Sequence, residues 1–360
     1  MSVVLRAAAP VPARVMVCDD SLVIRAAISR MLQTDPGIEV VARVANGQAA
    51  LDALKQSKPD VVVLDIEMPV MDGMTALPLL LRADPGLRVV MASTLTTRGA
   101  DIALRALRLG AADYLPKPSS IGSVSDDGFR RELLEKVRGL ARLRHRAVEP
   151  PSTGAPARLT LRPAPAMPAR LLAVGSSTGG PQALFTLVQG LGRALAVPVV
   201  LTQHMPPTFT PILAEHLTKL GGMPCGEAKD KEVLLPSRIY LAPGDRHLLV
   251  EGARGAMRAR LSDAPAENFC RPSVDPMLRS AAAACEGRVL VAMLTGMGHD
   301  GLAGTRVVVQ AGGAALAQDE TTSVVWGMPG AIAEAGLCHA VLPLTRLAPK
   351  LLDMLRGARL

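Results

Sequence analysis

Short apolar runs alternate along the chain with longer segments of helical periodicity, and this happens in two series. The first series has its apolar runs at residues 14–18, 61–65, 88–93 and 113–118, and the second at 170–177, 197–203, 288–294 and 312–318. Such alternation is typical of parallel sheets whose two faces are covered by helices. The pattern predicts an α/β chain with two doubly wound parallel-sheet domains.

A proline- and alanine-rich stretch separates the two series. From residue 150 it reads "PPSTGAPARLTLRPAPAMP", which has little apolar periodicity and predicts a semi-extended linker. The helix before it is expected to begin at Asp126 or Asp127. Its apolar face is expected to consist of Phe129, Leu133, Val137 and Leu140. We therefore predict domains at 1–146 and 169–360, joined by a linker at 147–168.

Composition limits the classes of function. Only seven of the 360 residues are aromatic, which leaves little material for stacking nucleic-acid bases. The net charge of +8 is concentrated between residues 128 and 170, where ten Lys or Arg residues face three Glu residues, so a solvated linker is favoured over a DNA-binding tail. No nucleic-acid partner is expected.

Cysteines and apolar run lengths indicate the compartment. The five cysteines contain no C-x-x-C pair, so neither a zinc site nor a disulfide framework is indicated. The chain has no run of eighteen apolar residues and no convincing signal peptide. We expect a cytoplasmic protein without direct membrane insertion.

The first half carries acidic residues where its strands are expected to end. Asp19 and Asp20 follow the run at 14–18, and Asp65 closes the run at 61–65. Ligands of parallel sheets gather beyond these strand ends, and converging carboxylates call for a hard cation such as Mg²⁺. Ser93 adds a hydroxyl and Lys117 an ammonium group. Together they predict a site for a phosphoryl group, with Asp65 as the nucleophile.

This half resembles the receiver domain of bacterial response regulators, over residues 14–146. The matching text is "CDDS", "VVVLDIEMPVMDG", "VVMAS" and "GAADYLPKP". The resemblance implies a flavodoxin-like fold and phosphorylation of Asp65 by a partner histidine kinase. It also implies Mg²⁺ bound by Asp20, Asp65 and the main-chain carbonyl of Glu67, with Asp19 acting through water. Ser93 is assigned as the switch hydroxyl, with Thr94 as the alternative.

A glycine-rich turn, "GSSTGGP" at 175–181, opens the second half. It lacks the Gly-Lys-Ser/Thr of a phosphate-binding loop, but Gly175, Ser177 and Gly179 fit G-x-S-x-G. In that motif small residues allow a sharp turn and raise the serine hydroxyl above the sheet edge. A structural Gly-Ser turn is the alternative interpretation.

A nucleophilic serine needs a base and a carboxylate that orients it. His204 directly follows the run at 197–203, and Asp300 lies in "LTGMGHDG" after the run at 288–294, so both are expected at the sheet edge that carries Ser177. A rival triad of Ser177, Asp300 and His339 would have the α/β-hydrolase order. It is disfavoured because a strand is expected to begin, not end, at His339.

The second half resembles the catalytic domain of the CheB family of chemotaxis protein-glutamate methylesterases, over residues 169–345. The matching stretches are "AVGSSTGGPQAL", "LTQHMPPTFT", "RPSVDPML", "LTGMGHDG" and "VVWGMPGA". The resemblance implies a Rossmann-like fold with Ser177 as nucleophile, His204 as base and acid, and Asp300 as orienting carboxylate. Thr178 and the amide of Met297 are expected to help hold the oxyanion.

Together the two resemblances imply a phosphorylation-activated serine hydrolase of sensory adaptation. It would demethylate γ-glutamyl methyl esters on methyl-accepting chemotaxis receptors, releasing methanol, deamidate glutamines there, and need no cofactor for the ester reaction. The chain departs from the usual family text at His299 and in "SDAPAENFCRPS" (262–273), which bears on receptor preference. The alternative is a catalytically weak, receptor-binding response regulator of a non-chemotaxis chemosensory pathway.

Overall fold

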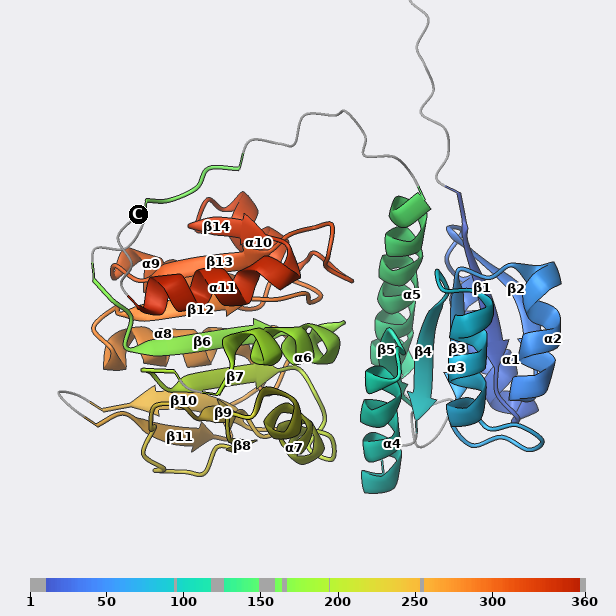
Figure 1. Ribbon diagram of the computed structural model, residues 1–360, viewed down its shortest axis with the longest axis horizontal. Helices are drawn as coiled ribbons and strands as arrows, with labels where there is room; N and C mark the ends of the chain where they lie inside the picture. Colours follow the sequence, from blue (N-terminus) through green and yellow to red (C-terminus); the bar gives the residue numbers. More distant parts are fainter. Residues whose placement is uncertain are drawn as a thin grey trace, which may run out of the picture. The chain divides into compact units, whose positions relative to one another are not determined.

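The protein forms two compact units, each built around its own parallel sheet (Figure 1). The computed structural model describes residues 11–93, 96–117, 126–148, 159–163, 167–193, 195–252 and 256–356. Thr94 and much of the predicted linker lie outside these ranges, so the predicted domain boundaries stay predictions. No helix within the described ranges is both long and apolar enough to cross a bilayer.

The first unit contains a five-stranded sheet in the order β2-β1-β3-β4-β5, and all its strand pairs are parallel. The strands are β1 (Ala13–Cys18), β2 (Ile38–Val44), β3 (Val61–Asp65), β4 (Arg88–Ser93) and β5 (Asp113–Pro116). Every residue of β3 is buried, as expected of an uninterrupted apolar run in a sheet covered on both faces. The edge strand β2, only partly buried, was not among the predicted runs.

Five helices connect or follow these strands: α1 (Leu22–Gln33), α2 (Gly47–Ser57), α3 (Gly73–Ala83), α4 (Thr97–Arg108) and α5 (Asp126–Val148). Helix α5 contacts β1, β3, β4 and β5. The predicted apolar face of α5 is confirmed for Leu133, Val137 and Leu140, which are at most 1% exposed, whereas Phe129 is half-buried.

The second unit contains a seven-stranded parallel sheet in the order β14-β13-β12-β6-β7-β9-β8. Its strands are β6 (Leu171–Ser176), β7 (Val199–Gln203), β8 (Cys225–Glu227), β9 (Ile239–Leu241), β12 (Val289–Met293), β13 (Ala314–Gln318) and β14 (Ala340–Leu342). An antiparallel hairpin of β10 (His247–Glu251) and β11 (Arg258–Ser262) forms a separate two-stranded sheet. The sequence pattern predicted β6, β7, β12 and β13, and a strand beginning at His339 where β14 lies, but not β8, β9 or the hairpin.

The helices that follow the strands of the second sheet form two groups (Figure 1). They are α6 (Gly180–Leu191), α7 (Thr210–Gly221), α8 (Val274–Ala284), α9 (Leu302–Gln310), α10 (Met328–Glu334) and α11 (Leu344–Leu355). Helix α6 contacts α7 and α11, while α9 contacts α8 and α10. Alternate residues of the strands, such as Leu171 and Ala173 of β6, enter one core with α8, α9 and α10. The predicted class of two doubly wound α/β domains is confirmed.

Candidate functional site

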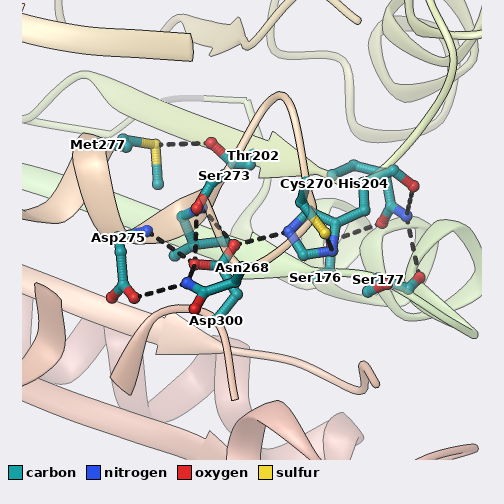
Figure 2. Close-up of polar contacts among 12 residues, drawn as sticks. Ser176, Ser177, Thr202, His204, Asn268, Cys270, Ser273, Asp275, Met277 and Asp300 are labelled. Carbon is teal, nitrogen blue, oxygen red and sulfur yellow. Dashed lines mark hydrogen bonds and ion pairs between the residues drawn. The ribbon is translucent and has the colours of Figure 1, made fainter. Parts of the chain in front are cut away.

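Three loops meet at the carboxyl edge of the second sheet. Ser177 directly follows β6, His204 directly follows β7, and Asp300 lies in the loop between β12 and α9. Strand β6 lies between β7 and β12, and all three run parallel, so their ends bring these loops together (Figure 2). From β6 the chain continues to β7 on one side, and the later strands β12, β13 and β14 are added on the other side. This edge is therefore a topological switch point, the usual ligand position in open α/β sheets.

The turn at Ser177 depends on its glycines. Gly179 has a φ of +74°, and a Cβ there would lie 2.4 Å from a Val324 methyl carbon. A Cβ on Gly180 would lie 2.0 Å from Oε1 of Gln203. The N–H of Gly180 donates to the Ser177 carbonyl at 2.7 Å. The chain therefore reverses sharply and presents Ser177, half-buried, at the start of α6.

Gln203, the last residue of β7, is a buried residue of the site that the sequence analysis missed. Its Oε1 accepts a hydrogen bond from Ser176 Oγ at 2.6 Å. Its Nε2 donates to the carbonyls of Ser177 at 2.9 Å and His204 at 3.1 Å. Gln203 thus ties the serine turn to the histidine loop. The sequence did contain a signal for Gln203, because it is a polar residue that ends an apolar run directly before the candidate base His204.

His204 and Asp300 are directly bonded. Nε2 of His204 lies 2.8 Å from Oδ2 of Asp300, whose side chain is 2% exposed (Figure 2). Burial opposes the charge of both groups and is the largest single influence on each pKa, but the mutual hydrogen bond, the attraction between the two charges and further hydrogen bonds together outweigh it. The pKa of Asp300 is lowered to about 2 and the pKa of His204 is raised to about 10, with contact to Cys270 contributing to the latter.

Asp300 also accepts hydrogen bonds from the start of α8. The main-chain N–H groups of Val274 and Asp275 donate to it at 2.6 and 3.1 Å, and Ser273 Oγ donates at 2.8 Å. Asn268 Nδ2 adds a donor at 2.9 Å. A carboxylate at a helix N-terminus also interacts favourably with the helix dipole. The same side chain therefore caps α8 and orients the imidazole. Asn268 and Ser273 were not among the predicted site residues.

The other ring nitrogen of His204 faces a thiol instead of the serine. Sγ of Cys270 lies 3.4 Å from Nδ1 (Figure 2). Among the described residues no hydrogen bond joins Ser177 Oγ to His204. The predicted residues thus share one edge and the His204–Asp300 pair is formed, but among the described residues no hydrogen bond joins the predicted nucleophile to the predicted base.

The loop after β12 packs on the serine turn from the other side. Thr295 accepts the Ser177 N–H at 3.0 Å, and its own hydroxyl donates to the Thr178 carbonyl at 2.9 Å. A Cβ on Gly296 would lie 3.0 Å from Cβ of Ser177. Met297 follows, half-buried, and no acceptor for its N–H is found within the described ranges. Thr178, which is buried, and Met297 therefore lie in the two loops that pack together at Ser177, and their oxyanion role stays a prediction.

Trp326 supports this loop from behind. Its backbone pairs with Gly296 in an isolated parallel bridge, and its indole Nε1 donates to the Gln318 carbonyl at 2.9 Å.

The rival base His339 does not lie at this edge. It precedes β14, and its Nδ1 accepts the N–H of Ala315 in β13 at 3.2 Å. The structure therefore does not bring His339 to Ser177.

His299, the residue at which the chain departs from the usual family text, lies beside Asp300 and is exposed.

The first unit holds a separate acidic pocket at the carboxyl edge of its own sheet. Nζ of Lys117, after β5, lies 2.8 Å from Oδ2 of Asp19 and 2.6 Å from Oδ1 of Asp65. Asp19 and Asp65 are buried, whereas Asp20 is exposed, yet one carboxylate oxygen of each lies within 4.8 Å of the others. This all-oxygen donor set fits Mg²⁺. Burial raises the pKa of Asp65, and the Lys117 ammonium opposes that rise.

The remaining predicted residues of the first unit lie around this pocket. Ser93, 1% exposed, ends β4, and its carbonyl accepts the Lys117 N–H at 2.6 Å. The side chain of Glu67 is exposed. Its predicted part in binding Mg²⁺ concerns only the main-chain carbonyl, and it stays a prediction. A Cβ on Gly73 would lie 2.0 Å from the Asp65 carbonyl oxygen, so only glycine fits this close approach.

One α/β unit has an acidic pocket like that of a receiver domain, and the other has serine, histidine and aspartate at one sheet edge. These two sites define a response regulator with a hydrolase domain. Family models agree: "CheB methylesterase" matches residues 172–351 and "Response regulator receiver domain" matches 15–126. The chain belongs to the CheB methylesterase family. The predicted family and the predicted class of carboxylic ester hydrolase are confirmed.

Individual relatives cover nearly the whole chain. A Rhodospirillum centenum protein named "Protein-glutamate methylesterase/protein-glutamine glutaminase of group 2 operon" is 53% identical, over 94% of this chain and 93% of its own. A protein-glutamate methylesterase/protein-glutamine glutaminase of Azospirillum brasilense is 52% identical, over 94% and 91%. The crystal structure of the Thermotoga maritima CheB methylesterase catalytic domain, 37% identical, aligns with a TM-score of 0.51 over 52% of this chain and 100% of that one.

Proposed function

We propose that the chain demethylates γ-glutamyl methyl esters of methyl-accepting chemotaxis receptors, with release of methanol, and deamidates receptor glutamines at the same site. The observation that carries the proposal is the convergence of Ser177, His204 and Asp300 at the ends of three adjacent parallel strands. Support also comes from the names of relatives that are about half identical over most of the chain.

In the proposed reaction Ser177 Oγ attacks the ester carbonyl while His204 takes the hydroxyl proton. Nε2 is engaged with Asp300, so Nδ1 of the neutral ring is the nitrogen that accepts this proton. Because the pKa of His204 is raised to about 10, the neutral ring is the minor form at neutral pH. The proton then passes to the leaving methoxide, and methanol departs. Water, activated by the same nitrogen, hydrolyses the acyl-serine to glutamate. The Met297 amide and Thr178 stabilise the oxyanion in both steps.

Methanol release from methylated receptor tests the esterase proposal. Wild type is expected to release methanol, and Ser177→Ala is expected to lose the activity, whereas Ser176→Ala is expected to keep most of it. Equal rates in wild type and Ser177→Ala would instead favour the second candidate, a receptor-binding regulator of a non-chemotaxis pathway. The observation in favour of that candidate is the missing hydrogen bond between Ser177 and His204 among the described residues.

We further propose that phosphorylation of Asp65 by a chemotaxis histidine kinase activates the esterase, with domains at 1–146 and 169–360 and the linker at 147–168. Mg²⁺ would be held by Asp20, Asp65 and the Glu67 carbonyl, with Asp19 acting through water, and would neutralise charge on the transferring phosphoryl group. Lys117 and the hydroxyl of Ser93 would then bind the phosphoryl oxygens. Methanol release that is equal with and without acetyl phosphate and Mg²⁺ would refute activation.

A further inference from the structure

Cys270 approaches the catalytic edge on a tight turn of the segment 262–273. The N–H of Cys270 donates to the carbonyl of Glu267 at 3.0 Å, and the reverse bond measures 3.1 Å. Asn268 and Phe269, between them, have φ values of +54° and +62°, the left-handed pair of a two-residue hairpin turn. Such a turn fixes the direction of both flanking side chains, and it directs Cys270 toward His204.

Two polar contacts hold this turn in place. Glu267 forms a two-pronged ion pair with Arg279 of α8, with both oxygen-to-nitrogen distances at 2.6 Å. Asn268 Nδ2 donates to both Asp300 and Asp275 at 2.9 Å. Because the turn is anchored on both sides of the catalytic carboxylate, the position of the thiol is set by the same network that orients the imidazole.

The thiol and the catalytic serine need the same nitrogen. Nε2 of His204 is bonded to Asp300, so Nδ1 alone is left to accept a proton from Ser177. In the structure Nδ1 faces Cys270 Sγ at 3.4 Å, and Ser177 Oγ has no bond to the ring among the described residues. A ring nitrogen makes one hydrogen bond in the ring plane, as a donor when it carries a proton and as an acceptor when it does not. The contacts with Cys270 and with Ser177 are therefore alternatives.

We propose that Cys270 is a positioning residue that holds His204 in a resting contact, which Ser177 must displace before the ester reaction begins. The inference rests on the proposed roles of Ser177 and His204. A thiol is a weak hydrogen-bond partner, so the resting contact delays the reaction without preventing it. Removing the thiol should raise the reactivity of Ser177 about two- to tenfold, the range that one modest hydrogen bond controls.

The test measures the rate at which a fluorophosphonate labels Ser177, in the full chain, for wild type, Cys270→Ala and Cys270→Ser. This probe needs an activated serine but no receptor docking. Cys270→Ala is expected to be labelled about two- to tenfold faster than wild type. Cys270→Ser retains a hydroxyl that can bond Nδ1, so it should be no faster than wild type. Cys225→Ala, at a half-buried thiol on the edge strand β8, is the matched control and should not change the rate.

The direction of the change separates the inference from a merely structural role. If Cys270 only supports the fold, Cys270→Ala will be slower than wild type and Cys270→Ser will restore the rate. That result, or equal rates in all three proteins with the label located on Ser177 by mass spectrometry, overturns the proposal for Cys270 and leaves the proposed function intact. Absence of label on Ser177 in every variant overturns the proposed function and this inference with it.

Discussion

Replacing Asp300 with asparagine tests whether one buried carboxylate both caps α8 and orients the base. Its Oδ2 accepts from His204 and Val274, and its Oδ1 accepts from Ser273, Asn268 and Asp275. Asparagine has one oxygen, which accepts hydrogen bonds, and one NH₂ group, which donates them. In either orientation the NH₂ group therefore faces N–H or O–H groups that are donors themselves. With the oxygen toward Oδ1's partners, the Val274 N–H loses its acceptor. With the oxygen toward Oδ2's partners, the Asp275 N–H loses its acceptor.

The cost follows from these contacts. A buried donor without an acceptor costs about 1–3 kcal/mol, and the surviving bonds lose the strength that the charge gives them. We expect Asp300→Asn to lower the free energy of unfolding by about 2–4 kcal/mol in urea titrations followed by circular dichroism. The orientation that saves more bonds turns the amide NH₂ toward His204, so Nε2 must accept and Nδ1 must carry the proton. The rate of methanol release should then fall about 10⁴-fold, because the imidazole is in the wrong tautomer.

Asp275→Asn is the matched control for this prediction. Asp275 is equally buried at the same helix start and accepts from Gly304 N and Asn268 Nδ2, but it does not touch His204. We expect a loss of about 1–3 kcal/mol in unfolding free energy and a rate within about tenfold of wild type. The reasoning is refuted if Asp300→Asn unfolds like wild type, or if the two variants lose the same activity.

Three further predictions concern the other parts of the two sites. In Gly296→Ala the added Cβ would lie 3.0 Å from Cβ of Ser177 and displace it. Methanol release should fall at least about tenfold, with little change in receptor binding measured by pull-down. An unchanged rate would refute the close packing. Incorporation of phosphate from acetyl phosphate should disappear in Asp65→Asn and on chelation of Mg²⁺, and incorporation that survives either change would exclude Asp65 or the metal. The pKa of Asp300 is lowered to about 2, so its charge stabilises the fold above the unfolded value of 3.8, and this contribution is lost as the pH falls toward 2. The stability difference between wild type and Asp300→Asn should therefore shrink by about 2 kcal/mol over that range in urea titrations, and a constant difference would contradict it.

The fold was predictable where strands are buried on both faces. Strands at the sheet centre, such as β3 and β6, begin with four consecutive apolar residues, because every residue of these strands is buried. The pattern weakens toward the edges: β2 is only partly buried, and β8, β9 and β14 have three residues each. A strand of that length is defined by pairing with its neighbour, which periodicity in the sequence does not record.

The same division applies to the site. Ser177, His204 and Asp300 were predictable because each follows an apolar run, and strand ends of a parallel sheet share an edge. Asn268 and Cys270 come from a turn whose path is set by tertiary contacts such as the ion pair of Glu267 with Arg279. No local pattern encodes that path, so sequence reasoning noted the unusual text of this segment but not where its side chains lie.

Trp326 gives the protein an intrinsic optical reporter. It is the only tryptophan of the chain, and it lies against Gly296 in the loop that contacts the serine turn. Indole emission responds to local polarity, so it will follow the esterase unit alone, without any attached dye. Phosphorylation of Asp65 in the other unit can alter this emission only if its effect crosses to the esterase. A change in fluorescence on adding acetyl phosphate therefore measures communication between the units directly, before any receptor is present.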